Sequence, residues 1–433
     1  AASARNDRSH SMPKHERIQY REAVREMFQH AYDGYLEHGY PESELRPTSC
    51  VGGPFELCKL SLVTLIDAMD TLAIMGNRSE FQRAVKLVSA HADFAVDRNV
   101  SVFETNIRVL GGLLSSHMLA TDRELALMDD DEYGGELLSL AADLADRLMP
   151  AFNTSTGIPY GTVNLQSGVP KDETVISSLA GAGSLSLEFS VLSALTGRPE
   201  YSEASQRAVR ALYQRRSVLG LVGKHINIRT GKWVESILGI GSNADSYFEY
   251  LLKMYLLFGD EAWWDMFSHS YAGIERYLKH GDWYADVDMY SGKARRQRFE
   301  NLQAFWPGLQ ALLGELDAAA RSLNAFYLVW RDWGFVPEEY DYVQWGNVPG
   351  GGHQRYPLRP ELIESTYLLH RATAEPSWLW AGRDFIDSLQ RWARTSCGYA
   401  TVRDIVTLEL EDEMPSFFLS ETTKYLFLLF DED

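Results

Sequence analysis

The feature that most constrains the fold is a long succession of helical segments joined by short connections. Near the start of the chain Tyr20, Val24, Met27 and Ala31 recur at the three- and four-residue steps of one helix face, and Gly39 follows as a stop signal. The same pattern returns at residues 60–74, 81–95, 105–120, 135–148, 180–195, 199–215, 245–258, 261–279, 302–313, 318–331, 361–372, 377–395 and 420–430. Such a succession predicts an array of paired helices. Because the sequence has no repeat of fixed period, an open solenoid is not favoured, and a closed ring of helices is the alternative.

Strand signals are few and local. Residues 224–234, KHINIRTGKWV, are typical of a hairpin that turns at Thr230-Gly231, and residues 157–169 alternate only loosely. No Pro/Ser-rich linker or block of charge interrupts residues 16–430. We therefore predict a disordered lead-in over residues 1–14 and a single all-α domain over residues 15–433, with minor β-hairpins.

Charge and hydropathy exclude several classes of function. The chain has 41 Lys and Arg against 60 Asp and Glu, a net charge of −19, so neither a nucleic acid nor an anionic membrane is an expected partner. No window reaches the roughly 18 apolar residues of a membrane span. The first residues are polar, so any secretory signal is expected to have been removed already.

Two features bear on the compartment. The chain has three cysteines, Cys50, Cys58 and Cys397, and their spacing is not that of a Cys/His metal site. Under oxidising conditions they would give one disulfide and one free thiol, and otherwise three buried thiols. Three triplets fit the N-glycosylation acceptor pattern and favour the secretory pathway; they begin at Asn77, Asn99 and Asn153.

Acidic residues inside apolar stretches are the best candidates for chemistry, because an unpaired buried charge is costly. They are Glu104, Glu188, Asp245, Glu249, Glu361, Glu364 and Glu421. Any one of them could simply be a helix-start acid favoured by the helix dipole, above all Asp245 and Glu361. If helices of one ring each begin with such an acid, however, the acids converge. Paired carboxylates are what glycoside hydrolysis needs: one acid for the leaving oxygen and one base for water.

Four strings, FETNIRVLGGLL, ADSYFEYLLK, LRPELIESTYLL and SFFLSETTKYLFLLF, resemble those of the class I α-1,2-mannosidases, glycoside hydrolase family 47. They occur in the family's order and cover about residues 17–430. The strings TLIDAMDTLAIMGN, AGAGSLSLEF, LQAFWPGLQ and SCGYAT resemble the branch of ER degradation-enhancing α-mannosidase-like proteins. The resemblance implies an (α/α)7 barrel that removes terminal α-1,2-linked mannose with inversion and uses calcium.

The resemblance also implies roles for individual residues. Glu104 matches the proposed general acid, Arg108 its neighbouring arginine, Asp245 the second catalytic carboxylate and Glu361 the general base that activates water. It leaves open how Glu104 and Asp245 divide the acid role. The implied substrate-binding residues are the arginine and acid beside Glu361, a stacking aromatic, an acid at the pocket floor and two further acids: Arg359, Glu364, Phe417, Glu421, Glu188 and Glu249.

The chain departs from the family pattern in a few places. Asn243 stands where the oligosaccharide-trimming ER members carry Arg, and Ala304 where they carry a disulfide cysteine. Cys50 and Cys397 instead match the pair bridged in the degradation-enhancing branch. The family's calcium-binding Thr lies in a Thr-Glu-x-His string after the last helix, beyond Asp433 of this chain, so the metal ligands are not assigned.

Two functional hypotheses follow. The first is an α-1,2-mannosidase of the endoplasmic reticulum lumen that trims high-mannose N-glycans on misfolded glycoproteins for ER-associated degradation. The second is a lectin-like binder of the same glycans without turnover, for which the missing calcium Thr is the one favourable feature. Cys58 would either lie buried or reach a protein disulfide isomerase-type oxidoreductase. An unrelated helical-barrel hydrolase is disfavoured by the ordered strings.

Overall fold

The computed structural model describes residues 11–129 and 132–432, and most of them are helical. The chain forms two compact units. The first consists of Ala1–Gly53, Gly281–Trp283 and Arg298–Asp433, and the second of Pro54–His280 and Tyr284–Gln297.

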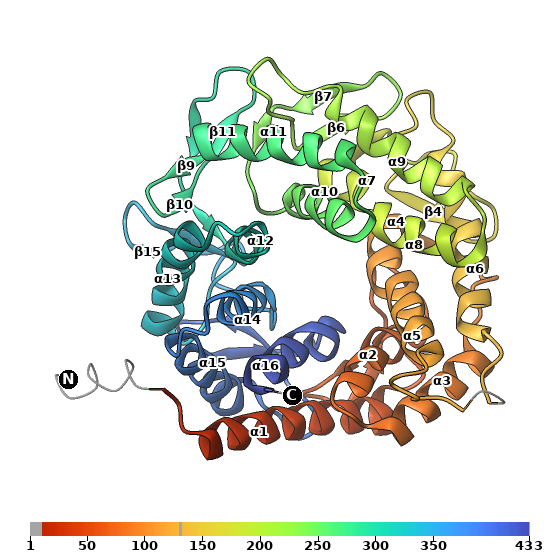
Figure 1. Ribbon diagram of the computed structural model, residues 1–433, viewed down its shortest axis with the longest axis vertical. Helices are drawn as coiled ribbons and strands as arrows, with labels where there is room; N and C mark the ends of the chain where they lie inside the picture. The colour runs from red at the N-terminus through yellow and green to blue at the C-terminus, as the bar shows by residue number, and fades with distance from the viewer. Residues whose placement is uncertain (1–10, 130–131, 433) are drawn as a thin grey trace. The chain divides into compact units, whose positions relative to one another are not determined.

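In the first unit, the helices agree closely with the segments predicted from periodicity. They are α1 (Lys14–Gly34), α12 (Trp306–Leu313), α13 (Leu316–Trp333), α14 (Glu361–Thr373), α15 (Ser377–Ser388) and α16 (Thr423–Phe430). Short 3₁₀ or π segments extend or precede several of them: η1 (Tyr35–Gly39), η4 (Asn301–Phe305), η5 (Leu389–Ala393) and η6 (Phe418–Thr422). The first helical run ends at Gly39, as predicted, and α1 packs along α16 (Figure 1).

The second unit contains the remaining helices. They are α2 (Val63–Ile74), α3 (Arg78–His91), α4 (Val102–Glu104), η2 (Thr105–Leu110), α5 (Gly111–Thr121), α6 (Glu136–Leu148), η3 (Met149–Phe152), α7 (Leu179–Gly183), α8 (Ser186–Thr196), α9 (Glu200–Tyr213), α10 (Asp245–Phe258) and α11 (Glu261–Tyr277). The predicted helix over 180–195 is broken into α7 and α8 around Ser184 and Leu185. At Gly183, the last residue of α7, the Tyr247 ring lies so close that a Cβ would meet it at 2.4 Å.

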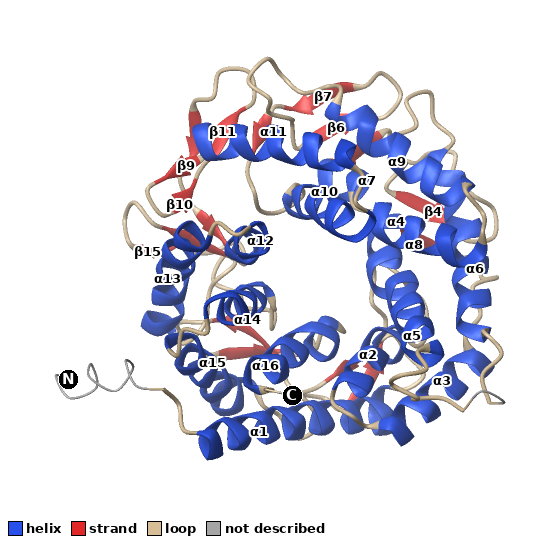
Figure 2. Cartoon of the chain, viewed as in Figure 1, coloured by secondary structure: helices blue, strands red, loops and turns tan. Residues whose placement is uncertain are grey.

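The strands are two to four residues long and lie in the connections between helices (Figure 2). In the first unit they are β1 (Glu44–Arg46), β2 (Val51–Gly53), β13 (Phe299–Glu300), β14 (Glu339–Asp341), β15 (Gly346–Asn347), β16 (Thr401–Asp404) and β17 (Glu409–Glu411). In the second they are β3 (Asn99–Ser101), β4 (Thr162–Asn164), β5 (Ile176–Ser178), β6 (His225–Asn227), β7 (Lys232–Glu235), β8 (Ile237–Leu238), β9 (Lys279–His280), β11 (Asp286–Asp288) and β12 (Ala294–Arg296); β10 (Trp283–Tyr284) lies at the boundary.

The hairpin predicted over residues 224–234 is confirmed by the structure. Strands β6 and β7 pair antiparallel with Asn227 opposite Lys232, and Gly231 takes the left-handed conformation of the turn (φ 69°). The other small antiparallel sheets include β3-β4, β13-β14-β15 and β16-β17. Segments this short show no alternation that periodicity can detect. Their role is to order the connections that lead into the helices.

Buried aromatic and aliphatic side chains form the core of each unit. In the first unit Trp330 packs edge-on against Phe385 of α15 and Tyr356, and Tyr356 stacks on Phe335. In the second unit α5 packs on α2 at Gly112, where a Cβ would lie 2.7 Å from the Ile66 carbonyl oxygen. Helices this close exclude any larger side chain at that position.

The predicted disulfide is present. Cys50 and Cys397 are bonded, with their Cα atoms 6.0 Å apart, and the bond links two segments of the first unit across 347 residues of sequence. Cys58 forms no disulfide and is fully buried, as the alternative of a buried thiol predicts. Its sulfur lies 3.5 Å from the Thr105 hydroxyl.

Two predictions about the chain's ends and hydropathy can be compared with the structure. Residues 1–10 of the expected lead-in lie outside the described residues, and Lys14, its last residue, begins α1. Among the described residues one stretch, Leu179–Thr196, is long and apolar enough to cross a membrane by length and composition alone. That stretch is broken into α7 and α8 and is 56% buried within the structure, which is the pattern of core helices.

Candidate active site

Each acidic residue singled out from the sequence lies at or near the start of a helical segment, with the exception of Glu249 in the second turn of α10. Asp245 and Glu361 are the first residues of α10 and α14, and Glu188 lies in the first turn of α8. Glu104 directly precedes the π-helical segment η2, and Glu421 lies within the π-helical segment η6. Single π turns inside helices often accompany functional sites. The helix dipole favours an ionised acid at all these starts.

Glu104 and Arg108 form a close ion pair in the second unit. The Arg108 Nε donates to Glu104 Oε2 over 2.9 Å, and the two side chains are only 11% and 18% exposed. The Arg108 guanidinium also lies over the Phe55 ring, 4.5 Å from its centroid. Ser101 caps the helix by accepting from the Glu104 N–H. The carboxylate therefore has a fixed position beside the Arg108 guanidinium.

Glu188 is held by two hydrogen bonds from neighbouring helices. The Asn106 Nδ2 of η2 donates to one oxygen over 2.8 Å, and the Tyr250 hydroxyl of α10 donates to the other over 2.7 Å. Burial raises the pKa of Glu188, and these two donors oppose that shift. Because Asn106 lies two residues after Glu104, the π segment η2 connects both carboxylates.

Asp245 and Glu249 have different surroundings on α10. Asp245 Oδ1 accepts from the backbone N–H of Ser246 over 2.8 Å and from its hydroxyl over 3.3 Å. Glu249 is paired with Lys253 over 2.6 Å, one turn further along. Asn243 precedes this helix in the left-handed region (φ 67°), which asparagine adopts more readily than most side chains. Asn243, at which this chain departs from the family pattern, therefore also sets the backbone conformation just before α10.

In the first unit, Arg359 is locked by Glu338 in a two-pronged ion pair. Its Nε and Nη2 approach the Glu338 oxygens at 2.9–3.1 Å, and both side chains are about one-fifth exposed. The segment around Arg359 is fixed on both sides. The Tyr356 hydroxyl donates to the Arg359 carbonyl over 3.0 Å, and the Thr422 hydroxyl of η6 donates to the Leu358 carbonyl over 2.6 Å.

Glu361 has the most perturbed carboxyl group of the site. Its Oε2 is buried and has no hydrogen-bond partner within the described part of the chain. Burial raises the pKa of Glu361 to about 8, and the nearby positive charge of Arg359 only partly opposes this shift. A strongly perturbed acid with an unpartnered oxygen is typical of a residue that exchanges protons or accepts a ligand.

Glu364 lies on α14 with Glu361, and Phe417 and Glu421 lie at η6, which contacts α14. Glu364 is 8% exposed and accepts from the Tyr425 hydroxyl of α16 over 3.2 Å. Phe417 caps η6 and is half-buried, and Glu421 follows one turn later, also half-buried. Contacts between α14, η6 and α16 hold these residues in one structural layer.

The structure thus brings the predicted residues together in two groups. The second unit groups Glu104, Arg108 and Glu188 around η2, with Asp245 and Glu249 on α10, which contacts α8. The first groups Arg359, Glu361, Glu364, Phe417 and Glu421 on α14 and η6. That the two groups line one pocket stays a prediction, as do the individual catalytic roles.

Several residues that hold these two groups of site residues in place were not predicted from the sequence. Glu338 stands in an adjacent acidic pair, Glu338-Glu339, that is typical of a solvated loop, so its pairing with Arg359 has no local signal. Glu44 of β1 is 1% exposed and accepts from the Ser416 N–H over 3.1 Å, which positions the residue next to Phe417. Both partners come from distant parts of the chain. Asn106, in FETNIR, could have been found by its place within a singled-out string.

The described residues contain no group of three or more His, Cys, Asp or Glu side chains arranged to hold a metal ion. Calcium binds six to eight oxygen ligands, about twice the number that a group of three such side chains would supply. The side chains present therefore do not form a calcium site by themselves. The candidate glycosylation residues Asn99 and Asn153 are exposed, whereas the half-buried Asn77 caps α3 by accepting from the Glu80 N–H.

Helices of both units carry acidic residues at or near their first turns, and paired carboxylates are what glycoside hydrolysis uses, so the class of protein indicated is a helical, carbohydrate-active one. The model of glycosyl hydrolase family 47 matches residues 27–433, so the chain belongs to this family. The solved α-1,2-mannosidase of Trichoderma reesei superposes with a TM-score of 0.87 at 25% identity, covering 96% of this chain and 94% of that one. This match confirms the predicted all-α fold class, an (α/α)7 barrel.

Two relatives refine the placement within the family. The chain is 49% identical over 429 residues to "Alpha-mannosidase I MNS4" of Arabidopsis thaliana, covering 97% of this chain and 67% of that protein. It is 47% identical over 416 residues to "ER degradation-enhancing alpha-mannosidase-like protein 2" of Homo sapiens, covering 95% of this chain and 71% of that protein. The predicted resemblance to the degradation-enhancing branch is confirmed.

Proposed function

We propose that this protein is an inverting α-1,2-mannosidase that removes terminal mannose from high-mannose N-glycans of misfolded glycoproteins in the endoplasmic reticulum lumen. The observation that carries the proposal is Glu361: a carboxyl group with one buried, unpartnered oxygen, beside an arginine that is locked by a second acid. Family membership and the names of the relatives support the substrate class and the compartment.

In this mechanism Glu361 takes a proton from a water molecule as it attacks the anomeric carbon. Glu104 delivers a proton to the leaving oxygen, directly or through a water, and Arg108 keeps the carboxyl group oriented. Inverting glycosidases hold the two carboxyl groups about 6.5–9.5 Å apart so that the attacking water fits between them. Phe417 would stack on the sugar face, and Glu364 and Glu421 would accept hydrogen bonds from its hydroxyls.

A second candidate function is a mannose-binding lectin without turnover, and the protonation of Glu361 favours it. A pKa of about 8 leaves this carboxyl mostly protonated at neutral pH in the free protein, and a protonated carboxyl cannot act as a base. For catalysis, the bound sugar or a cation must lower that pKa. Calcium dependence, the glycosylation of Asn77, Asn99 and Asn153, and an oxidoreductase partner stay predictions from the sequence.

The test is incubation of the parent and the Glu361→Gln variant with a high-mannose N-glycan. Glutamine keeps size and hydrogen bonding but cannot accept the proton, so mannose release should fall about 100- to 10,000-fold while glycan binding persists. Glu124→Gln, at an exposed position, is the matched control and should keep full release. Proton NMR during the first turnovers should show β-mannose if the reaction inverts.

Equal release by the parent and the Glu361→Gln variant would remove Glu361 as the base. Binding without release by either protein, with calcium supplied, would establish the lectin instead. A chelator arm separates the metal question from the role of Glu361.

A further inference from the structure

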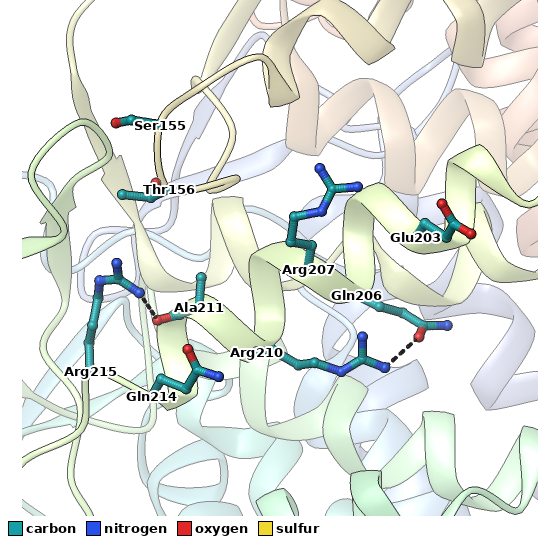
Figure 3. Close-up of a pocket in the computed structure, with 9 residues that line it drawn as sticks. All are labelled: Ser155, Thr156, Glu203, Gln206, Arg207, Arg210, Ala211, Gln214 and Arg215. Atoms are coloured by element: carbon teal, nitrogen blue, oxygen red, sulfur yellow. Dashed lines mark hydrogen bonds between the residues drawn. The ribbon is translucent and has the colours of Figure 1, made fainter.

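A basic groove lies along α9, and none of its lining residues is assigned to the candidate active site. It is a cavity of about 530 Å³ in the second unit, bordered by α9 and by Ser155 and Thr156 of the preceding loop. Three arginines line it: Arg207, Arg210 and Arg215 (Figure 3). We call these three residues the α9 arginine row.

The sequence around the row is unusual for this chain. Residues 204–234 contain seven Lys and Arg and no Asp or Glu, whereas the whole chain carries 60 acidic residues among 433. A strongly acidic protein with net charge −19 has therefore kept one continuous segment free of negative charge. Segregated charge of this kind marks a surface that attracts a partner of opposite sign.

The stems of the row are fixed by packing. The backbone at Gly157 approaches the Arg207 stem so closely that a Cβ would lie 3.0 Å from Arg207 Cδ. Arg215 Nη1 donates to the Ala211 carbonyl over 2.6 Å (Figure 3), and Gly231 of the β6-β7 turn would bring a Cβ within 2.3 Å of Arg215 Nε. Arginines held in this way lose little further freedom on binding a ligand.

The loop on the opposite side of the groove is equally well anchored. The Ser155 hydroxyl donates to the Arg229 carbonyl over 2.7 Å, and the Thr156 hydroxyl donates to the Ile228 carbonyl over 2.5 Å. Loop, helix and hairpin therefore form one frame around the cavity. The groove is present before any partner binds.

The positive charges of the row are not neutralised within the protein. In residues 11–129 and 132–432, no carboxylate forms an ion pair with Arg207, Arg210 or Arg215; Arg210 donates only to the Gln206 amide over 2.9 Å. Other arginines in the described chain do form ion pairs with acids, as Arg198 does with Asp146. Glu203 also lines the cavity, but at the end of the row away from Arg215 (Figure 3).

The distance that the three arginines cover distinguishes a small anion from a longer acidic ligand. Arg207 and Arg210 lie one turn apart on α9, and Arg215 follows two residues after Tyr213, the last residue of that helix. At 1.5 Å of rise per residue the helical part from Arg207 to Tyr213 alone spans about 9 Å, which exceeds the reach of one phosphate or carboxylate. An extended polypeptide covers that distance in about three residues at roughly 3.3 Å each. The row therefore matches successive carboxylates of one chain better than a single small anion.

We propose that the α9 arginine row is a docking site for an acidic polypeptide segment of a partner protein. Each guanidinium would receive one carboxylate, and the flanking amides of Gln206 and Gln214 would bond the partner's backbone. None of the lining residues of this site is assigned to the candidate active site, so substitutions in the row leave the proposed catalytic residues unchanged.

The experiment uses the full chain and a fluorescein-labelled octapeptide of alternating Glu and Ser, followed by fluorescence anisotropy. The parent should bind it at low salt and lose affinity as salt rises, because exposed charge pairs are screened over about 10 Å at 0.1 M. R207E/R210E should weaken binding at least about tenfold. The control R98E/R123E makes the same charge change at exposed arginines elsewhere and should stay within about twofold.

Several outcomes would overturn the proposal. They are no peptide binding by the parent at low salt, equal weakening by both double variants, and competition by inorganic phosphate at the same concentration as the unlabelled peptide. Thermal melting checks folding, and R207Q/R210Q supplies a milder variant with the same expected direction if R207E/R210E does not fold. Mannose release from a free glycan should be the same in all variants; a parallel loss in R207E/R210E would show that the row belongs to the glycan site.

Discussion

Replacement of Glu361 by glutamine should make the protein more stable at alkaline pH, and the structure gives the size of the effect. The ordinary pKa of a glutamate is 4.5, and burial raises that of Glu361 to about 8. Below pH 4.5 the carboxyl is protonated in both the folded and the unfolded protein. Between pH 4.5 and 8 only the unfolded state releases the proton, so the parent's stability falls as pH rises.

One unit of pKa difference corresponds to about 1.36 kcal/mol, so the parent should lose about 4 kcal/mol relative to Glu361→Gln between pH 5 and pH 8. Glutamine does not titrate, so the variant lacks this loss. An unfolding entropy near 2.1 cal/mol/K per residue gives about 0.9 kcal/mol/K for the whole chain. The variant should therefore gain about 4–5 °C in Tm over the parent across this range.

The assay is thermal unfolding of both proteins by circular dichroism at half-unit steps from pH 5 to 8.5. Glu124→Gln, at an exposed position, controls for the loss of one negative charge and should follow the parent. A Tm difference that does not change with pH would refute the reasoning, because it would mean that Glu361 has the same pKa in the folded and unfolded states.

Three further changes have expected results. Replacement of both Cys50 and Cys397 by serine should lower the free energy of unfolding by about 2–5 kcal/mol in urea titrations, and an unchanged midpoint would mean that the 347-residue separation adds no constraint. Gly112→Ala should cost about 1–3 kcal/mol, because its Cβ would meet the Ile66 carbonyl at 2.7 Å; a neutral result would show that α5 moves freely on α2. Arg359→Lys should cost about 1.5–3 kcal/mol and lower glycan affinity, since lysine cannot reproduce the two-pronged pairing; wild-type affinity by calorimetry would contradict this.

The sequence predicted the helices well because each has a local signal of apolar spacing. The segments over 245–258 and 361–372 coincide with α10 and α14 to within a residue. Prediction failed where tertiary contacts override the pattern. The apolar run over 180–195 predicts one helix, yet the chain leaves the helical conformation at Ser184 and Leu185, next to the close packing of Gly183 against Tyr247. The small sheets were missed because strands of two to four residues carry no period.

The same division holds for the candidate site. The acids could be found from sequence alone, because a carboxylate in an apolar segment is conspicuous, and the family strings assigned Glu104, Asp245 and Glu361 to the predicted roles. Their partners could not be found. Glu338 and Arg359 are 21 residues apart, and Glu44 and Ser416 are 372 apart, so only folding places them in contact.

Sequence by itself therefore predicted the helical segments and the acidic residues, which depend on residue type and local spacing that a linear chain displays directly. The family strings then implied the pairing of Cys50 with Cys397, which no local spacing indicates. Only the tertiary structure decided which groups touch, how deeply each carboxyl is buried and hence in which direction its pKa moves. It alone also shows that the α9 arginine row has no ion pair within the described chain. Burial and pairing depend on residues brought together from distant parts of the chain, and no local pattern records them.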